Sequence, residues 1–119
     1  MRSQSTNPQL VSLVSRLRKR SREFKTPLYR RIAEDLCRSK RTRRTVNLGK
    51  IARHTSEESV VAVPGKVLSA GSLDHKVTVA AFNFSKQARE KIEKAGGRCI
   101  SLYVLAEENP RGAKIVLLG

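Results

Sequence analysis

The chain has 119 residues, with 25 Lys and Arg against 10 Asp and Glu, a formal net charge of +15 and an aromatic content of only 4%. This length supports one domain whose core is built from Val, Leu, Ile and Ala, and the charge calls for a polyanionic partner. Since the sequence has neither an apolar run of the roughly 18 residues that a membrane span needs nor a secretion-type N-terminus, we expect a soluble cytoplasmic protein with no membrane partner.

The positive charge is concentrated in the first half of the chain. Residues 1–54 contain 16 Lys and Arg against 3 acidic residues, a net charge of +13, whereas residues 55–119 contain 9 against 7, a net charge of +2. The second half has the composition of an ordinary globular domain. We therefore predict a basic N-terminal helical extension with an RNA-binding loop over residues 1–45, and an α/β globular body over residues 46–119.

Two short helices are predicted in the extension. The first begins at Asn7-Pro8, and the second begins at Thr26-Pro27 and ends near Ser39, because a capping residue followed by proline favours a helix start. Residues 38–45, RSKRTRRT, have no apolar periodicity and predict an irregular loop that a polyanion orders. Each helix has apolar residues at helical spacing: Leu10, Leu13, Val14 and Leu17 in the first, and Leu28, Tyr29, Ile32, Ala33, Leu36 and Cys37 in the second.

The second half alternates strands with helices. The run VNLGKI from Val46 is a weak strand or a short turn, SVVAVPGKVLSAG from Ser59 contains one long or two short strands, and KVTVAAF from Lys76 is a clear strand. A helix follows from Ser85 to Ala95. Residues 98–105 mix strand and helix patterns with a possible cap at Ser101, residues 109–112 predict a turn, and KIVLLG predicts a last strand. The pattern is that of an α/β fold.

Two windows of seven residues, 16–22 and 38–44, each contain five cations and no acidic residue. Most of these cations are arginine, whose planar guanidinium binds phosphate oxygens in pairs and stacks on bases. The alternative is a solvated helix face and a loop without a partner. The helix after Ser85 differs, because it mixes cations and acids at i, i+4 spacing, which predicts a solvated surface. The two clusters, which predict nucleic-acid contact, are Arg16, Arg18, Lys19, Arg20 and Arg22, and Arg38, Lys40, Arg41, Arg43 and Arg44.

Little in the sequence supports catalysis. No phosphate-binding loop motif is present, and Ser72, Asp74 and His75 are near neighbours that favour a turn with a surface histidine over a catalytic triad. The two cysteines, Cys37 and Cys99, fit core positions and make neither a disulfide framework nor a structural zinc site. We expect no catalytic residues, no metal, no cofactor and no small-molecule substrate.

Several longer segments resemble one protein family. They are VNLGKIARHT from Val46, the block from VPGKVLSAG at Val63 to KIEKAGG, the basic RSKRTRR loop and AEENPRG from Ala106. These segments resemble the archaeal and eukaryotic large-subunit ribosomal protein eighteen, of the eighteen-e type, which is related to bacterial large-subunit protein fifteen. The resemblance implies an irregular superhelix of β-β-α turns preceded by a basic two-helix and loop extension. It also implies a structural role on large-subunit ribosomal RNA, beside neighbouring large-subunit ribosomal proteins.

The VPGK motif of this family is Val63–Lys66 in the chain. Its glycine lets the backbone approach RNA or a neighbouring strand, and Lys66 can reach phosphate; a plain β-turn is the alternative. We add Lys50, Arg53 and Lys66 to the predicted RNA-binding residues. His54 ends the same basic stretch.

Two other kinds of protein remain open. A small basic DNA-compacting protein or RNA chaperone would carry similar charge, and it would bind duplex DNA with comparable affinity. A small RNA-modifying or RNA-cleaving enzyme would need His54 or His75.

Overall fold

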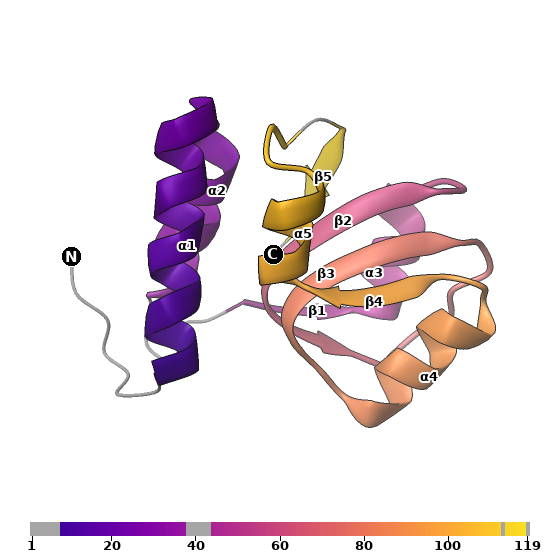
Figure 1. Ribbon diagram of the computed structural model, residues 1–119. Coiled ribbons are helices and arrows are strands. Elements are labelled where there is room, and N and C mark those ends of the chain that lie inside the picture. Colours follow the sequence, from indigo (N-terminus) through magenta and orange to yellow (C-terminus); the bar gives the residue numbers. More distant parts are fainter. Residues whose placement is uncertain (1–7, 38–43, 113, 119) are drawn as a thin grey trace.

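A parallel sheet lies between two layers of helices in the computed structural model, which describes residues 8–37, 44–112 and 114–118 (Figure 1). The mixed α/β class is confirmed, with two helices ahead of the sheet. In chain order the elements are α1 (Pro8–Phe24), α2 (Pro27–Leu36), β1 (Arg44–Asn47), α3 (Leu48–His54), β2 (Ser59–Leu68), β3 (Val77–Phe84), α4 (Lys86–Lys94), β4 (Arg98–Ser101), α5 (Leu102–Glu108) and β5 (Ile115–Leu117).

The sheet has the strand order β1-β2-β3-β4, and β5 also pairs with β2. All of these pairings are parallel. Since β3 occupies one edge of β2, the other edge is shared: β5 lies opposite residues 60–62 and β1 lies opposite residues 65–68. The long strand β2 is therefore the centre of the sheet.

The VPGK motif lies inside β2, so the β-turn alternative is wrong and the run from Ser59 is one long strand. The register between β2 and β3 shifts between Val63 and Lys66, which places an extra residue in β2 at Pro64-Gly65. Proline has no N–H to give to a neighbouring strand, and a bulge accommodates that loss. Gly65 is buried opposite Arg44 of β1, which matches the predicted close approach to a neighbouring strand.

The two faces of the sheet support separate apolar clusters. Val61 and Val63 of β2 pack with α3 and α4, whereas Ala62 between them packs with α1, α2 and α5. This alternation follows from the twofold repeat of side chains along a strand. Ala80 of β3 belongs to the same cluster as Ala62, on the face covered by α1, α2 and α5. These small side chains leave room for the buried ring of Tyr29 in that cluster.

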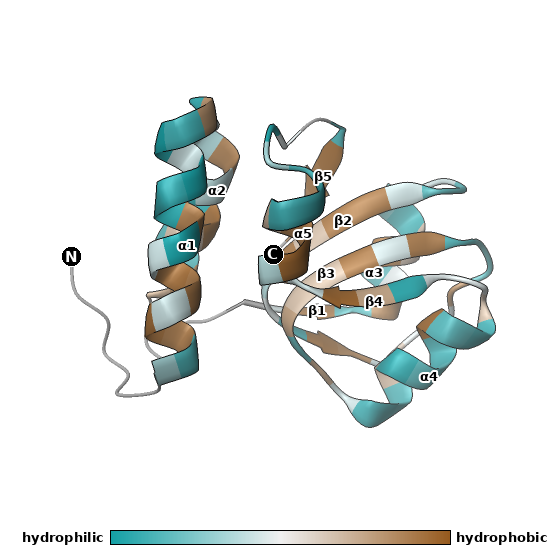
Figure 2. Cartoon of the chain, in the orientation of Figure 1, coloured by the Kyte–Doolittle hydropathy of each residue, from teal (hydrophilic) through white to brown (hydrophobic). Residues whose placement is uncertain are grey.

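The two N-terminal helices pack in the same cluster as the sheet. The predicted stripe of α1 is buried at Leu10, Val14 and Leu17, and Leu13 packs at its margin. Figure 2 shows the hydrophilic remainder of α1 turned away from the sheet. Helix α2 ends at Leu36, with Cys37 as its C-cap, three residues before the predicted end near Ser39, which lies outside the described residues. The division of the chain after residue 45 stays a prediction.

Two serine caps are confirmed. The Ser85 hydroxyl accepts a hydrogen bond from the Ala88 N–H of α4, and that of Ser101 accepts one from the Val104 N–H of α5. Thr26 is the N-cap residue of α2 by position, but its hydroxyl donates to the carbonyl oxygen of Phe24 instead of capping the helix.

The VNLGKI run differs from its prediction. Its first residues form the end of β1, and Leu48 begins α3, a helix that the sequence pattern did not indicate. The helix places Leu48 and Ile51 on one face, where both are buried against the sheet. Tertiary packing therefore determines this short helix, which is below the length that is stable alone.

Candidate nucleic-acid interface

Helix α1 presents cations to solvent on the side away from its buried stripe. Helix periodicity places Lys19 opposite that stripe, and Lys19 is exposed, as is Arg22. The helix forms because Pro8 opens it and its apolar residues recur at helical spacing. Both side chains are accessible to a polyanion from the outside of the molecule.

Two other arginines of the first cluster contact the far end of the chain. Arg16 Nη2 lies 3.1 Å from Glu107 Oε1, and Arg20 Nη2 bonds to the other carboxylate oxygen of Glu107. Arg20 also lies 3.3 Å from Glu23. These ion pairs lower the pKa of the Glu107 carboxyl, chiefly through the hydrogen bond from Arg20. Arg16 and Arg20 thus link α1 to α5, and Glu107 and Glu23 together balance their two positive charges.

Arg16 also contacts an aromatic ring. Arg16 donates to the Tyr103 hydroxyl, and its guanidinium carbon lies 4.9 Å from the centre of that ring. Arg18 is half-buried, and its Nη2 donates to the Cys37 sulfur over 3.7 Å. Cys37 is buried, as predicted for a core cysteine.

Most of the second cluster lies outside the described residues: Arg38, Lys40, Arg41 and Arg43. Arg44 is the first residue of β1, where its backbone pairs opposite Gly65. This pairing fixes where the basic segment enters the sheet.

Lys91 of α4, on the helix that sequence analysis assigned to a solvated surface, and Arg53 of α3 both lie beside the segment that follows β2. The Lys91 ammonium donates to the carbonyl oxygens of Ser69, at 2.9 Å, and Gly71, at 3.2 Å. Gly49 of α3 packs against Gly71, one of the two residues whose carbonyls Lys91 binds. Arg53 lies beside this contact, because its Nη1 would be 3.5 Å from a Cβ placed on Gly49. Charge pattern could not identify Lys91, because its partners are backbone carbonyls about 20 residues away in sequence.

Lys50, also on α3, is half-buried, and Lys66 is exposed on β2. Helix α3 packs against both β1 and β2. These predicted residues therefore belong to one end of the sheet rather than to the outer face of α1.

His75 connects two loops. Its Nδ1 lies 2.9 Å from Asp74 Oδ1, and its Nε2 lies 2.7 Å from Thr55 Oγ1, which donates to the Ile51 carbonyl. The bond from His75 lowers the pKa of Asp74. The His75 side chain is only 14% exposed, so it is more buried than the predicted surface histidine, and these contacts hold it between the two loops. Within the described part of the chain, no group of three His, Cys, Asp or Glu side chains is placed to hold a metal ion.

The comparisons with known proteins agree with the basic surface. The model of the family described as ribosomal protein 60S L18 and 50S L18e matches residues 1–119. The chain belongs to this ribosomal protein family.

Relatives named large ribosomal subunit protein eL18 are similar along most of the chain. The protein from Methanothermobacter thermautotrophicus is 49% identical over 105 residues, which cover 88% of this chain and 87% of the relative. That from Sulfurisphaera tokodaii is 50% identical over 107 residues, covering 90% and 87%. That from Methanococcus maripaludis is 42% identical over 114 residues, covering 96% and 95%. The resemblance identified from the sequence is confirmed.

Proposed function

We propose that this chain is a structural constituent of the large ribosomal subunit and binds large-subunit ribosomal RNA through its Lys and Arg side chains. The observation that carries this proposal is the family match over residues 1–119, with relatives named as large ribosomal subunit proteins. The net charge of +13 in residues 1–54 supplies the chemical reason for an RNA partner. Neighbouring large-subunit proteins are the other proposed partners, and the cytoplasmic ribosome is the proposed location.

The described cations divide into two roles in this proposal. Exposed ones such as Lys19 and Arg22 contact phosphate directly, whereas Arg16 and Arg20, already paired with Glu107, position α1 and add to the local positive potential. The full proposed set is Arg16, Arg18, Lys19, Arg20, Arg22, Arg38, Lys40, Arg41, Arg43, Arg44, Lys50, Arg53 and Lys66.

The proposed mechanism is electrostatic docking on folded RNA. Each Lys or Arg that neutralises a phosphate releases condensed counterions, so the binding constant falls steeply as salt rises. Stacking of arginine on exposed bases and contacts to 2′-hydroxyl groups supply the specificity for RNA. Residues 38–45 contribute five cations and no acidic residue, and we propose that this segment contacts RNA along its length.

A salt titration of binding tests the role of α1. Affinity for deproteinised large-subunit ribosomal RNA is measured at several salt concentrations for the parent and for Lys19→Ala/Arg22→Ala. The variant is expected to reduce the slope of log K against log [salt] by about 1.5 to 2, because two phosphate contacts are lost. The matched control is Lys86→Ala/Lys94→Ala, which removes the same charge from exposed positions of α4. Equal effects of the two variants would show that only total charge matters.

Incorporation into particles tests the whole proposal. Sedimentation of a cell lysate at low and at high salt is expected to place the chain with the large subunit, and Arg41→Ala/Arg43→Ala/Arg44→Ala is expected to reduce that incorporation. Free protein at the top of the gradient, or protein on chromatin with equal affinity for duplex DNA, would instead favour the DNA-compacting alternative. Unchanged incorporation of the triple variant would remove residues 41–44 from the interface.

The family match also supports a role without catalysis, as proposed from the sequence. Because His75 is held by Asp74 and Thr55, we propose that it stabilises the fold. His54→Ala and His75→Ala are therefore expected to leave RNA chemically unchanged, as the parent does. Turnover of RNA by the parent that either variant abolished would restore the enzyme alternative.

A further inference from the structure

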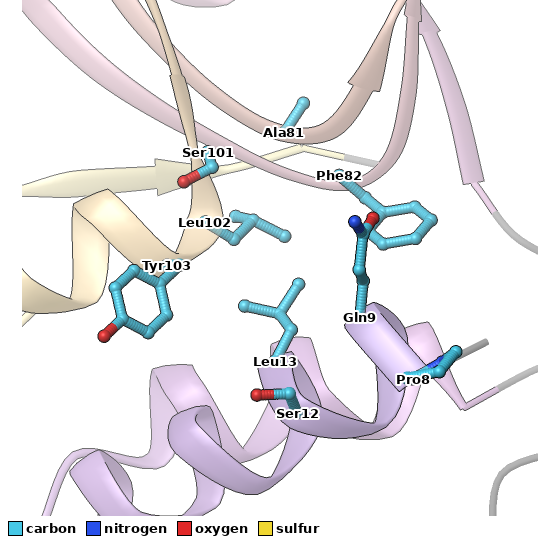
Figure 3. Close-up of a pocket in the computed structure, with 9 residues that line it drawn as sticks. All are labelled: Pro8, Gln9, Ser12, Leu13, Ala81, Phe82, Ser101, Leu102 and Tyr103. Carbon is cyan, nitrogen blue, oxygen red and sulfur yellow. The ribbon is translucent and has the colours of Figure 1, made fainter.

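A groove separates the first turns of α1 from the ends of β3 and β4 (Figure 3). Its volume is about 450 Å³, which lies within the range of small-molecule binding pockets. Its walls are largely apolar: Leu13 comes from α1, Phe82 from β3, and Leu102 and Tyr103 from α5. Ser12 of α1 lies at its exposed edge, and Tyr103 is 41% exposed.

A second hollow borders this groove at β3. It has a volume of about 330 Å³ and shares Ala81, Phe82 and Ser101 with the first. Phe84 and Arg89 line its other end. The two hollows are therefore lined by aromatic side chains of β3 and α5.

The charge around the groove suits an anionic polymer that carries flat apolar groups. Among the described residues, the lining of the two hollows includes no acidic residue, and Arg89 lines the second. Each end has an arginine on an aromatic ring: Arg89 lies 5.0 Å from the centre of Phe84, and Arg16 lies 4.9 Å from that of Tyr103. On the Tyr103 side, the α5 residue Glu107 is paired with two arginines.

We propose that this groove receives an unpaired base of ribosomal RNA, which inserts between α1 and the ring of Tyr103, while Arg89 faces an adjoining phosphate and Arg16 adds positive potential at the Tyr103 end. An apolar slot with aromatic walls and cationic ends is the combination that proteins use for single-stranded nucleic acid. The serine hydroxyls at the edge of the slot can bond to the base edge. The inference rests on the proposed RNA binding, and it adds a base contact to an interface otherwise made of phosphate contacts.

The test fills the groove without removing charge. Ser12→Phe places a ring at the mouth of the groove from an exposed position of α1, and Ser15→Phe places the same ring on the same helix at an exposed position outside the lining. Affinity for deproteinised large-subunit ribosomal RNA is expected to fall by about fivefold to a hundredfold for Ser12→Phe, the range measured for one stacked base. The salt slope is expected to stay at the parent value, because no phosphate contact is lost.

A second pair of variants keeps the test independent of how Ser12→Phe packs. Tyr103→Ala removes the ring and is expected to weaken binding, whereas Tyr103→Phe retains the ring and is expected to bind more tightly than Tyr103→Ala. Irradiation of the parent complex at 254 nm is expected to attach a nucleotide to a peptide that contains Phe82 or Tyr103.

Three outcomes would overturn the inference. Parent affinity in both Ser12→Phe and Tyr103→Ala would show that no base enters the groove, while a normal salt slope would leave the proposed function intact. The loss of a neighbouring protein from particles reconstituted with Ser12→Phe, at unchanged RNA affinity, would assign the groove to a peptide. Absence of salt-dependent RNA binding by the parent would end both proposals together.

Discussion

The backbone of Gly71 lies directly against that of Gly49. A Cβ on Gly71 would be 2.7 Å from both the Cα and the nitrogen of Gly49, and the Gly49 N–H donates to the Ala70 carbonyl over 3.0 Å. The contact is asymmetric, because a Cβ on Gly49 would meet its neighbours at 3.5 Å or more. Of these two touching glycines, only Gly71 has to be a glycine.

This contact is a consequence of the parallel pairing of β2 and β3. Residues 69–76 alone connect the end of β2 to the start of β3, and the register places Ser59 opposite Val77. The connection must therefore run back along almost the full length of β2, on the side where Leu73 packs with α3 and α4. A chain this extended passes α3 closely, and Gly71 is the residue at the closest point.

Gly71→Ala is expected to lower the free energy of unfolding by about 2 to 4 kcal/mol, since the positive φ of +90° and the clash with Gly49 act together. Gly96→Ala is the matched control for φ, which is +88° there, and its Cβ would meet only the flexible Lys76 side chain at 3.2 Å. That control is expected to lose about 1 to 2 kcal/mol. Urea unfolding followed by circular dichroism measures all three proteins.

Gly49→Ala tests the other side of the same contact. It is expected to leave stability unchanged within about 1 kcal/mol, because alanine favours the helix and meets no close atom. A loss as large as that of Gly71→Ala would contradict the asymmetry of the contact.

Lys91→Met is expected to weaken the connection between β2 and β3. Methionine keeps most of the apolar stem but removes the ammonium that donates to Ser69 and Gly71. Amide hydrogen exchange in residues 69–73 is expected to accelerate several-fold, with a loss of about 1 kcal/mol in stability. Lys94→Met, an exposed position on the same helix, is the control, and equal exchange in the two variants would remove this role of Lys91.

The Tyr29 phenol is expected to lose its proton at a higher pH than an exposed tyrosine does. Burial raises its pKa to about 12, and its hydroxyl bonds to the Asn109 carbonyl. Because the folded pKa exceeds the unfolded value near 10, the protein keeps its full stability below pH 10 and loses about 3 kcal/mol as the pH rises toward 12. With two tyrosines and no tryptophan in the chain, absorbance of Tyr103→Phe near 295 nm follows Tyr29 alone. A midpoint near pH 10 in the folded protein would contradict this environment.

Glu107→Gln is expected to lower the melting temperature slightly, because it breaks the link from Arg16 and Arg20 to α5. The arginines lower the pKa of Glu107, so the link is complete above the usual glutamate pKa and is lost as the pH falls through the lowered value. The difference in melting temperature between parent and variant should therefore shrink in acid. RNA affinity is expected to stay equal or rise, since the variant removes one negative charge beside Arg16 and Arg20. A marked loss of RNA affinity would show that the link itself orients the interface.

Local chemistry made much of this fold predictable. The stripe of α1, the serine caps at Ser85 and Ser101 and the strands from Ser59 and Val77 follow from side-chain periodicity and capping, which depend on neighbours a few residues away. Long ordered motifs indicated the family in the same way. The exposure of Lys19 also followed from helix geometry.

Contacts between distant residues required the tertiary structure. Nothing in the sequence distinguishes Arg16 and Arg20 from the other cations of their cluster. Only the packing of α1 against α5 places Glu107 between them, although Glu107 is 87 residues from Arg20. The parallel pairing of β2 and β3, the helix at Leu48 and the groove beside Tyr103 arise in the same way. The sequence by itself determined most of the elements, the family resemblance and the basic character of the protein. The tertiary structure alone decided which cations are already paired and where an aromatic groove opens, because such contacts depend on how the layers pack rather than on spacing along the chain.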